Sequence, residues 1–154
     1  MSKILEDVKT IAVVGASDNP VRPSYFVMRY MQRKGYRILP VNPGKAGGEL
    51  LGEKVFASLS EIDEPVDMVD CFRKADAIDG ITTEAIAIGA KVLWMQLGVT
   101  HAEAARRAED AGMRVVMNRC PKIEYGRFSG EIAYMGGRSG IISSKRNKLV
   151  GKRK

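Results

Sequence analysis

The stretch from Thr10 to Ser17 constrains the fold of this chain more than any other feature. It contains four consecutive apolar residues (11–14), three of them β-branched, followed by Gly15. Such a run is typical of a strand buried on both faces of a parallel sheet. Glycine can end this strand because it permits a sharp turn and lets a ligand approach the backbone closely. We therefore expect the rest of the fold to be built around this strand and its glycine turn.

A helix is predicted shortly after this strand. Residues 18–20 are turn formers, and Ser24 is placed to cap a helix with apolar periodicity. A strand, a glycine turn and a helix N-terminus together direct unpaired backbone N–H groups at one point, which suits a phosphate. The turn at 15–17 matches neither GxGxxG nor GxxxxGK[ST]. A phosphate-binding turn for a nucleotide is predicted, and a turn without a ligand is the alternative.

The composition is that of one globular domain. The chain has 154 residues, of which 45% are hydrophobic and 28% charged, so it is long enough for one core and short for two. No apolar run approaches the roughly 18 residues of a membrane span. The N-terminal segment lacks the pattern of a secretory signal. We expect a soluble, cytoplasmic protein with no membrane partner.

The formal net charge of +7 is concentrated at the C-terminus. Residues 138–154 hold seven of the 25 basic residues and none of the 18 acidic ones, so residues 1–137 are formally neutral. The chain therefore divides into a folded domain (1–137) and a basic tail (138–154), which is expected to be flexible. Binding of a nucleic acid or an acidic partner through this tail is an alternative function.

Strand-like and helix-like segments alternate along the domain. Helices are predicted near 4–8, 25–34, 75–88 and 101–111, the last three ending at Gly35, Gly89 and Gly112. Strands are predicted at 10–14, 37–41, 66–72, 91–95 and 114–117, the third being 66–72. The alternation indicates βαβ units with right-handed crossovers. The predicted fold is a Rossmann-like, three-layer α/β sandwich whose five-stranded parallel sheet has the order 3-2-1-4-5.

Two capping boxes are predicted at helix N-termini. Ser58 with Glu61, and Thr100 with Glu103, have the spacing of a cap residue and its acidic partner. The single histidine, His101, would then be near the start of the last helix, where the helix dipole disfavours a cationic imidazole. A catalytic role for His101 is therefore not expected.

The carboxyl ends of the five strands are expected to meet in one pocket, because ligands bind there in parallel α/β folds. An enzyme that binds an unphosphorylated ribose usually has Asp or Glu at the end of the second strand. Here Asn42 and Pro43 take that place, and Lys45 is nearby. This favours a nucleotide with a ribose phosphate, NADP or coenzyme A, over NAD. Small or polar residues interrupt the apolar pattern at every strand end: 15–17, 42–43, 71–73, 96–98 and 118–121.

Five segments in combination resemble the small stand-alone CoA-binding proteins: VVGAS (13–17), VNP (41–43), VDCFR (69–73), WMQLGV (94–99) and NRCPKIE (118–124). That family is similar in turn to the N-terminal CoA-binding domain of the succinyl-CoA synthetase alpha subunit. The resemblance covers about residues 5–124. It implies a Rossmann-like domain that holds coenzyme A at its strand ends, with no settled reaction of its own. Asn118 departs from the family pattern, which has an acidic residue there.

The resemblance also implies which residues bind the cofactor. Gly15, Ala16 and Ser17 would lie near the diphosphate, with Arg22 in reach. Asn42, Pro43 and Lys45 would lie beside the adenosine and its 3′-phosphate. Phe72 and Arg73 would flank the nucleotide or the path of the pantetheine, whose inner arm Gln96, Gly98 and Asn118 would line.

Neither catalysis nor metal binding is expected from the residues. The chain has no CxxC pair, and Asp67 and Asp70 are interpreted as strand-edge or capping acids. Cys71 and Cys120 are expected to be reduced. Cys120 lies beside Arg119, so a reversible disulfide with the CoA thiol is an alternative to a buried structural thiol.

The predicted function is non-covalent binding of coenzyme A or an acyl-CoA without catalysis. An NADP-dependent oxidoreductase and an accessory subunit of an acyl-CoA ligase are alternatives. The partner is therefore a small nucleotide ligand. A second copy of the chain, or an unknown protein, is left open as a further partner.

Overall fold

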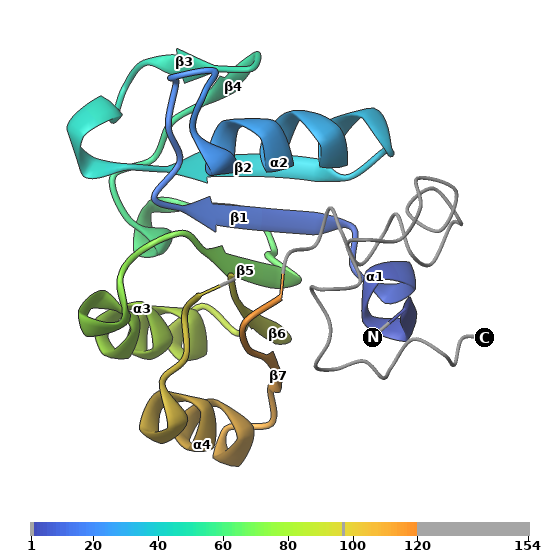
Figure 1. Ribbon diagram of the computed structural model, residues 1–154, viewed down its shortest axis with the longest axis vertical. Coiled ribbons are helices and arrows are strands. Elements are labelled where there is room, and N and C mark those ends of the chain that lie inside the picture. The colour runs from blue at the N-terminus through green and yellow to red at the C-terminus, as the bar shows by residue number, and fades with distance from the viewer. Residues whose placement is uncertain (1, 97, 120–154) are drawn as a thin grey trace.

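The computed structural model describes residues 2–96 and 98–119 (Figure 1). Cys120 and the predicted basic tail lie outside the described residues. The strands of the main sheet are β1 (Thr10–Val14), β2 (Arg37–Val41), β5 (Met68–Cys71), β6 (Val92–Met95) and β7 (Arg114–Val116). The helices are α1 (Ser2–Asp7), α2 (Pro23–Arg33), α3 (Ala75–Ala87) and α4 (Ala102–Asp110). Smaller elements are η1 (Pro43–Lys45), β3 (Glu49–Leu50), β4 (Glu53–Lys54) and η2 (Leu59–Glu61).

The main sheet is parallel throughout and has the order β2-β1-β5-β6-β7. Beyond β2, Phe56 forms an isolated parallel bridge with Val41. If the segments are numbered along the chain as β1, β2, Phe56, β5 and β6, their order across the sheet is 3-2-1-4-5. Strand β7 then lies beyond β6. The predicted third strand, 66–72, corresponds to β5 and lies beside β1. The five-stranded parallel sheet and the Rossmann-like fold are confirmed.

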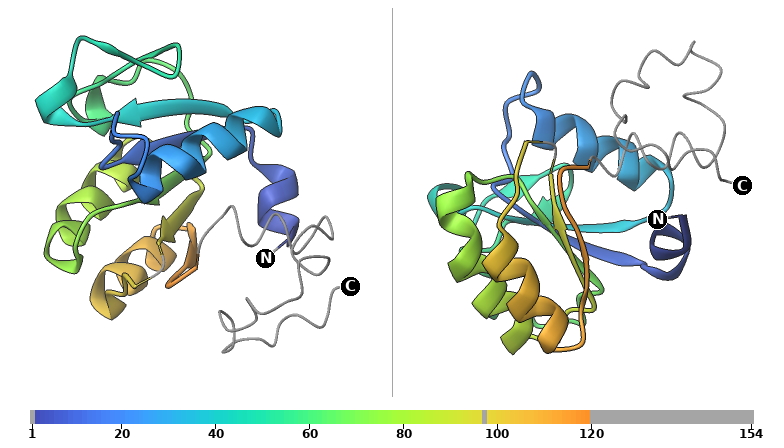
Figure 2. Two further views of the ribbon diagram at one scale, coloured as in Figure 1. Left: turned by 45° about the horizontal axis from the view of Figure 1, so that its top comes forward. Right: turned by 60° about the horizontal axis from the view of Figure 1, so that its bottom comes forward.

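The helices cover the sheet on both faces, which makes three layers (Figure 2). Alternate residues of each strand point to opposite faces. Ile11 and Val13 of β1 pack with residues of α1 and α2, whereas Ala12 and Val14 pack with residues of α3 and α4. All four side chains are buried. The apolar run in β1 is therefore explained by a strand that is covered on both sides.

The predicted helix ends are confirmed, but three predicted caps are not. Ser24 lies inside α2; Arg22 is the N-cap residue and makes no side-chain capping bond. His101, rather than Thr100, caps α4, because its Nδ1 accepts from the N–H of Ala104 at 3.1 Å. Ser58 precedes η2 without a side-chain capping bond. The hydroxyl of Ser24 accepts instead from the N–H of Ser17, and the hydroxyl of Ser58 pairs with that of Ser60 at 2.9 Å.

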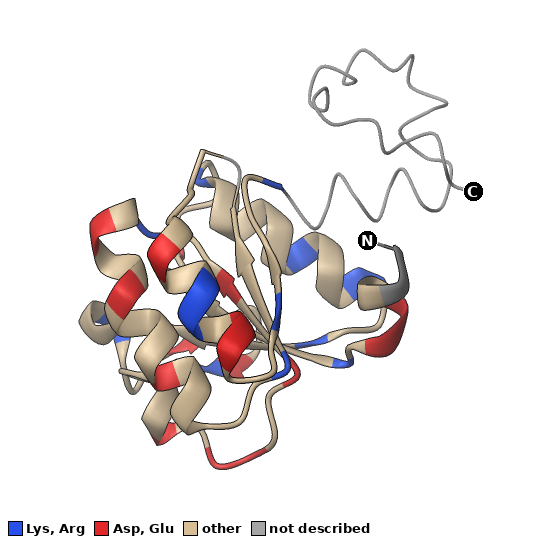
Figure 3. Cartoon of the chain, turned by 90° about the horizontal axis from the view of Figure 1, so that it is seen from below, with Lys and Arg blue, Asp and Glu red and all other residues tan. Residues whose placement is uncertain are grey.

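Charged residues are distributed differently over α3 and α4 (Figure 3). Helix α3 carries Asp76, Asp79 and Glu84 and no basic residue, whereas α4 carries both signs. The ion pair between Arg107 of α4 and Asp79 of α3 joins the two helices at 2.7 Å. No helix in the described part of the chain is long and apolar enough to cross a lipid bilayer.

Candidate functional site

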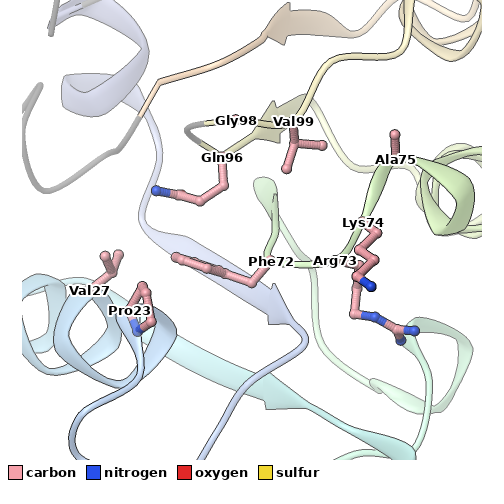
Figure 4. Close-up of a pocket in the computed structure, with 9 residues that line it drawn as sticks. All are labelled: Pro23, Val27, Phe72, Arg73, Lys74, Ala75, Gln96, Gly98 and Val99. Atoms are coloured by element: carbon pink, nitrogen blue, oxygen red, sulfur yellow. The ribbon is translucent and has the colours of Figure 1, made fainter.

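A cavity of about 490 Å³ opens at the carboxyl ends of β5 and β6, beside the first turns of α2 and α3 (Figure 4). Its volume is within the roughly 300–1,000 Å³ typical of small-molecule sites. Its position is that expected for a ligand in a parallel α/β fold. Nine residues line it: Pro23, Val27, Phe72, Arg73, Lys74, Ala75, Gln96, Gly98 and Val99.

The cavity has an apolar side and a cationic side. Pro23 and Val27 of α2 face the ring of Phe72, and the side chain of Gln96 points into the space between them (Figure 4). Arg73 and Lys74 lie at the other side, where α3 begins. A ligand with an anionic end and a largely apolar end would match this arrangement.

The predicted glycine turn is present, and it makes a tight contact with the cavity wall. Gly15 has a φ of +89°, and a Cβ atom placed on it would lie 2.5 Å from the backbone oxygen of Phe72. The same atom would lie 3.0 Å from Cδ of Arg73. The stem of Arg73 therefore runs across the glycine turn, which only a residue without a side chain allows.

The amides of this turn are not the unpaired donors that the sequence suggested. The N–H groups of Gly15 and Ala16 both donate to the carbonyl of Val41, at 3.0 and 3.2 Å. The N–H of Ser17 donates to Oγ of Ser24 at 3.1 Å. These bonds attach the turn to β2 and α2, so donors for a phosphate would have to come from elsewhere.

The N-termini of α2 and α3 offer such donors. Their N-cap residues, Arg22 and Lys74, make no side-chain capping bond. Pro23 has no N–H, and the N–H groups of Tyr25 and Ala77 donate to the carbonyls of Arg22 and Lys74. The amides left for an anion are therefore those of Ser24 in α2 and of Ala75 and Asp76 in α3, where the helix dipole favours an anion. Within the described residues, Arg22, Arg73 and Lys74 form no ion pair. Positive charge without an internal partner is thus gathered where the two helices begin.

The residues predicted to lie beside the adenosine, Asn42, Pro43 and Lys45, do not line the cavity. Asn42 and Lys45 instead bind other residues of the protein. Nδ2 of Asn42 donates to the carbonyl of Ala16 at 2.7 Å, and its Oδ1 accepts from the N–H of Gly44 at 2.8 Å. Nζ of Lys45 pairs with Oδ2 of Asp18 at 3.3 Å. Pro43 begins η1. The loops after β1 and β2 are therefore joined to each other at the strand ends.

Of the three residues predicted to line the inner arm of the pantetheine, two line the cavity and one does not. Gln96 and Gly98 line the cavity. Gln96 is only 7% exposed, and its Oε1 is buried without a hydrogen-bond partner among the described residues. Asn118 does not line the cavity; its Oδ1 accepts from the N–H of Gly98 at 2.6 Å, and its φ is +58°. Asn118 thereby holds the loop that follows β6.

Asp70 differs most from its sequence interpretation. It is not at a strand edge: it lies in the middle of β5, between Val13 and Trp94 in register, and it is 1% exposed. Its Oδ1 has no hydrogen-bond partner among the described residues. Burial raises the pKa of Asp70 well above the ordinary value. Asp67, in contrast, is the predicted capping acid, since its Oδ2 accepts from the N–H groups of Lys9 and Thr10.

The described cysteine is not reactive. Cys71 is fully buried, and burial, together with the neighbouring Asp70 carboxyl, raises the pKa of its thiol. A thiol held protonated is a poor nucleophile.

Four of the residues that line the cavity were predicted as site residues (Phe72, Arg73, Gln96 and Gly98), and sequence reasoning missed the other five. Of these, Lys74 and Ala75 carried a signal: they precede and begin a helix at a strand end.

The fold and its strand-end cavity are those of a Rossmann-like α/β domain. A family model described as a CoA binding domain matches residues 9–126. The chain therefore belongs to the family of CoA-binding domains, and the predicted relationship to stand-alone CoA-binding proteins is confirmed.

Relatives extend over most of the chain. The uncharacterized protein YneT of Bacillus subtilis (strain 168) is 41% identical over 125 residues, which is 81% of this chain and 91% of YneT. A solved structure from Thermus thermophilus is 42% identical, with a TM-score of 0.79, and covers 82% of this chain and 94% of its own. A hypothetical protein from Pyrococcus horikoshii OT3 is 39% identical, with a TM-score of 0.78, over 82% of this chain and 87% of its own.

The fold also occurs as one part of a larger enzyme. The dinucleotide-forming acetyl-coenzyme A synthetase 1 of Ca. Korarchaeum cryptofilum is 26% identical, with a TM-score of 0.66 over 77% of this chain. This chain spans 28% of that enzyme.

Proposed function

We propose that this protein binds coenzyme A or an acyl-CoA non-covalently in the cavity, without catalysing a reaction of its own. The observation that carries the proposal is the cavity itself, in which Arg73, Lys74 and an uncapped helix N-terminus face an apolar wall with one buried amide. Coenzyme A has the same division, because its phosphates are anionic and its pantetheine arm is largely apolar with amide groups.

The diphosphate would bind at the beginning of α3. The first-turn amides and the two cations, Arg73 and Lys74, supply charge-assisted hydrogen bonds there. Arg22, at the beginning of α2, would approach the same group from the other side. The glycine turn contributes by its shape, since it leaves room for Arg73, and its amides do not contact the phosphate.

The pantetheine arm would lie along the apolar wall. Val27, Phe72 and Val99 supply apolar surface, and the buried Oε1 of Gln96 lacks a donor. An amide N–H of the arm is such a donor, and a buried acceptor without one costs roughly 1–3 kcal/mol. Among the lining residues described, none is an acid, a thiol or an imidazole, which favours binding over turnover.

The adenosine would extend from Arg73 towards Lys45. The chain has no acidic side chain directly after β2, where an unphosphorylated ribose is usually recognised. Lys45 provides a cation for a ribose phosphate at that end. This direction places the diphosphate and the ribose phosphate of the ligand on different cations.

Calorimetric titration with CoA, dephospho-CoA, NADP and ATP tests the proposal. We expect CoA to bind more tightly than dephospho-CoA, and NADP and ATP to bind weakly. Binding of NADP without binding of CoA would overturn the proposal in favour of an oxidoreductase, which NADPH oxidation would then show. Binding of CoA only together with a second, ligase-like chain would favour the accessory-subunit alternative.

A further inference from the structure

One acidic residue lies where a ligand phosphate is expected. Oδ2 of Asp18, in the loop after β1, is 3.3 Å from Nζ of Lys45 in the loop after β2. The side chains are 57% and 50% exposed, so the pair is open to solvent and to a competing anion. A phosphate that binds Lys45 has to displace this carboxylate.

The other cations near the site have no such partner. Arg22, Arg73 and Lys74 form no ion pair with a described residue, although acidic residues are frequent on the surface. Lys45 is thus distinguished from them by an anion of the protein itself.

The position of Asp18 is fixed by the loop that carries it. The N–H of Asn19 donates to Oγ of Ser17 at 3.0 Å, and the N–H of Val21 donates to Oδ1 of Asn19 at 3.1 Å. The preceding carbonyl of Ala16 accepts from Asn42. Since these bonds hold the backbone on both sides of Asp18, its carboxylate can pair with Lys45 without a change in the loop.

We infer that Asp18 is a specificity-determining residue that competes with the ribose phosphate of the ligand for Lys45. This inference rests on the proposed function, because it needs a ligand with a phosphate at that end. Exposed ion pairs are weak, so a phosphate with up to two negative charges replaces the carboxylate. Breaking the pair between Asp18 and Lys45 offsets part of the gain from phosphate binding, which lowers the preference for a 3′-phosphorylated ligand over an unphosphorylated one.

The test compares CoA with dephospho-CoA in calorimetric titrations of the full chain and its variants. In Asp18→Asn we expect CoA to bind about two- to fivefold more tightly, while the affinity for dephospho-CoA stays the same. In Lys45→Met we expect weaker binding of CoA and unchanged binding of dephospho-CoA. In the double variant, Asp18→Asn should no longer strengthen binding of CoA. The matched control is Asp110→Asn, which removes an exposed acid at the end of α4 and should change neither affinity.

The outcomes separate this inference from the function on which it rests. If wild-type protein binds both ligands and Asp18→Asn leaves the CoA affinity unchanged, or changes both affinities equally, the competition is disproved and CoA binding stands. If wild-type protein binds neither ligand, the proposed function fails and the inference fails with it.

Discussion

The backbone of Gly15 lies directly against the backbone carbonyl of Phe72, at a separation that leaves no space for a side chain. The N–H of Phe72 also donates to the carbonyl of Val14 at 2.8 Å. The end of β1 and the end of β5 are therefore joined at the point where the cavity begins. Because Phe72 and Arg73 line the cavity, the contact with the turn at Gly15 determines the position of this part of the cavity wall.

Gly15→Ala should destabilise the protein by about 2–4 kcal/mol, because it adds a steric clash to an unfavourable φ. The free energy of unfolding in urea measures this. Gly35→Ala is the matched control: Gly35 also has a positive φ, +99°, but nothing lies within 4 Å of its Cβ position. It should cost only about 1 kcal/mol. Equal losses in the two variants would show that the contact with Phe72 is unimportant.

Asp70→Asn should be more stable than the wild type at neutral pH, and the two proteins should have similar stability at acidic pH. Burial raises the pKa of Asp70 in the folded state, so the unfolded chain releases this proton first. The wild type therefore has its full stability below about pH 4 and loses part of it as the pH rises from there through the folded pKa. Asparagine does not titrate, so the variant escapes this loss.

Urea unfolding of both proteins between pH 3 and pH 8 checks this expectation. The two stabilities should be similar near pH 3, and the variant should gain about 1–3 kcal/mol at neutral pH. A variant that is less stable than the wild type at every pH would mean that the Asp70 carboxyl is a required structural group.

Arg73→Ala and Lys74→Ala should each weaken CoA binding about tenfold and leave the fold intact, since a charge-assisted hydrogen bond is worth roughly 1.5–3 kcal/mol. The matched control is Arg33→Ala, which removes an exposed arginine at the other end of α2. It should leave the affinity unchanged. An unchanged affinity in the Arg73 variant would remove this residue from the site.

Deletion of residues 138–154 separates the basic tail from the cavity. CoA binding should be unaffected, because the cavity is built from residues 23–99. Any binding of nucleic acid by the full chain should disappear in the shortened chain and fall steeply with salt in the full one. Gel-shift titrations at two salt concentrations measure this; nucleic-acid binding that survives the deletion would point to the folded domain instead.

Much of the fold was predictable because its strands are short apolar runs that end at small residues. The predicted helix at 75–88 is α3 (Ala75–Ala87), and the predicted strand at 37–41 is β2. The hairpin of β3 and β4 was not predicted. Each of its strands has two residues, which is too short for an alternating pattern to be seen.

The site was harder to predict, because it depends on which hydrogen bonds form after folding. Serine is a common helix N-cap residue, yet the hydroxyl of Ser24 accepts a hydrogen bond from the N–H of Ser17. The N–H groups of Gly15 and Ala16 donate to the carbonyl of Val41 at the end of β2, and no local sequence pattern shows this contact. Burial of Asp70 in the centre of the sheet contradicts the usual preference of aspartate for surfaces, so only the three-dimensional arrangement could show it.

The most direct test of the account is an amide NMR titration of the full chain with CoA. If CoA binds between the N-termini of α2 and α3, the amide resonances of Ser24, Ala75 and Gly98 should shift most. Those of Asp67 and Arg114, at the opposite edge of the sheet, should stay in place. Shifts that are largest at Asp67 and Arg114, or no shifts at saturating CoA, would contradict the central claim.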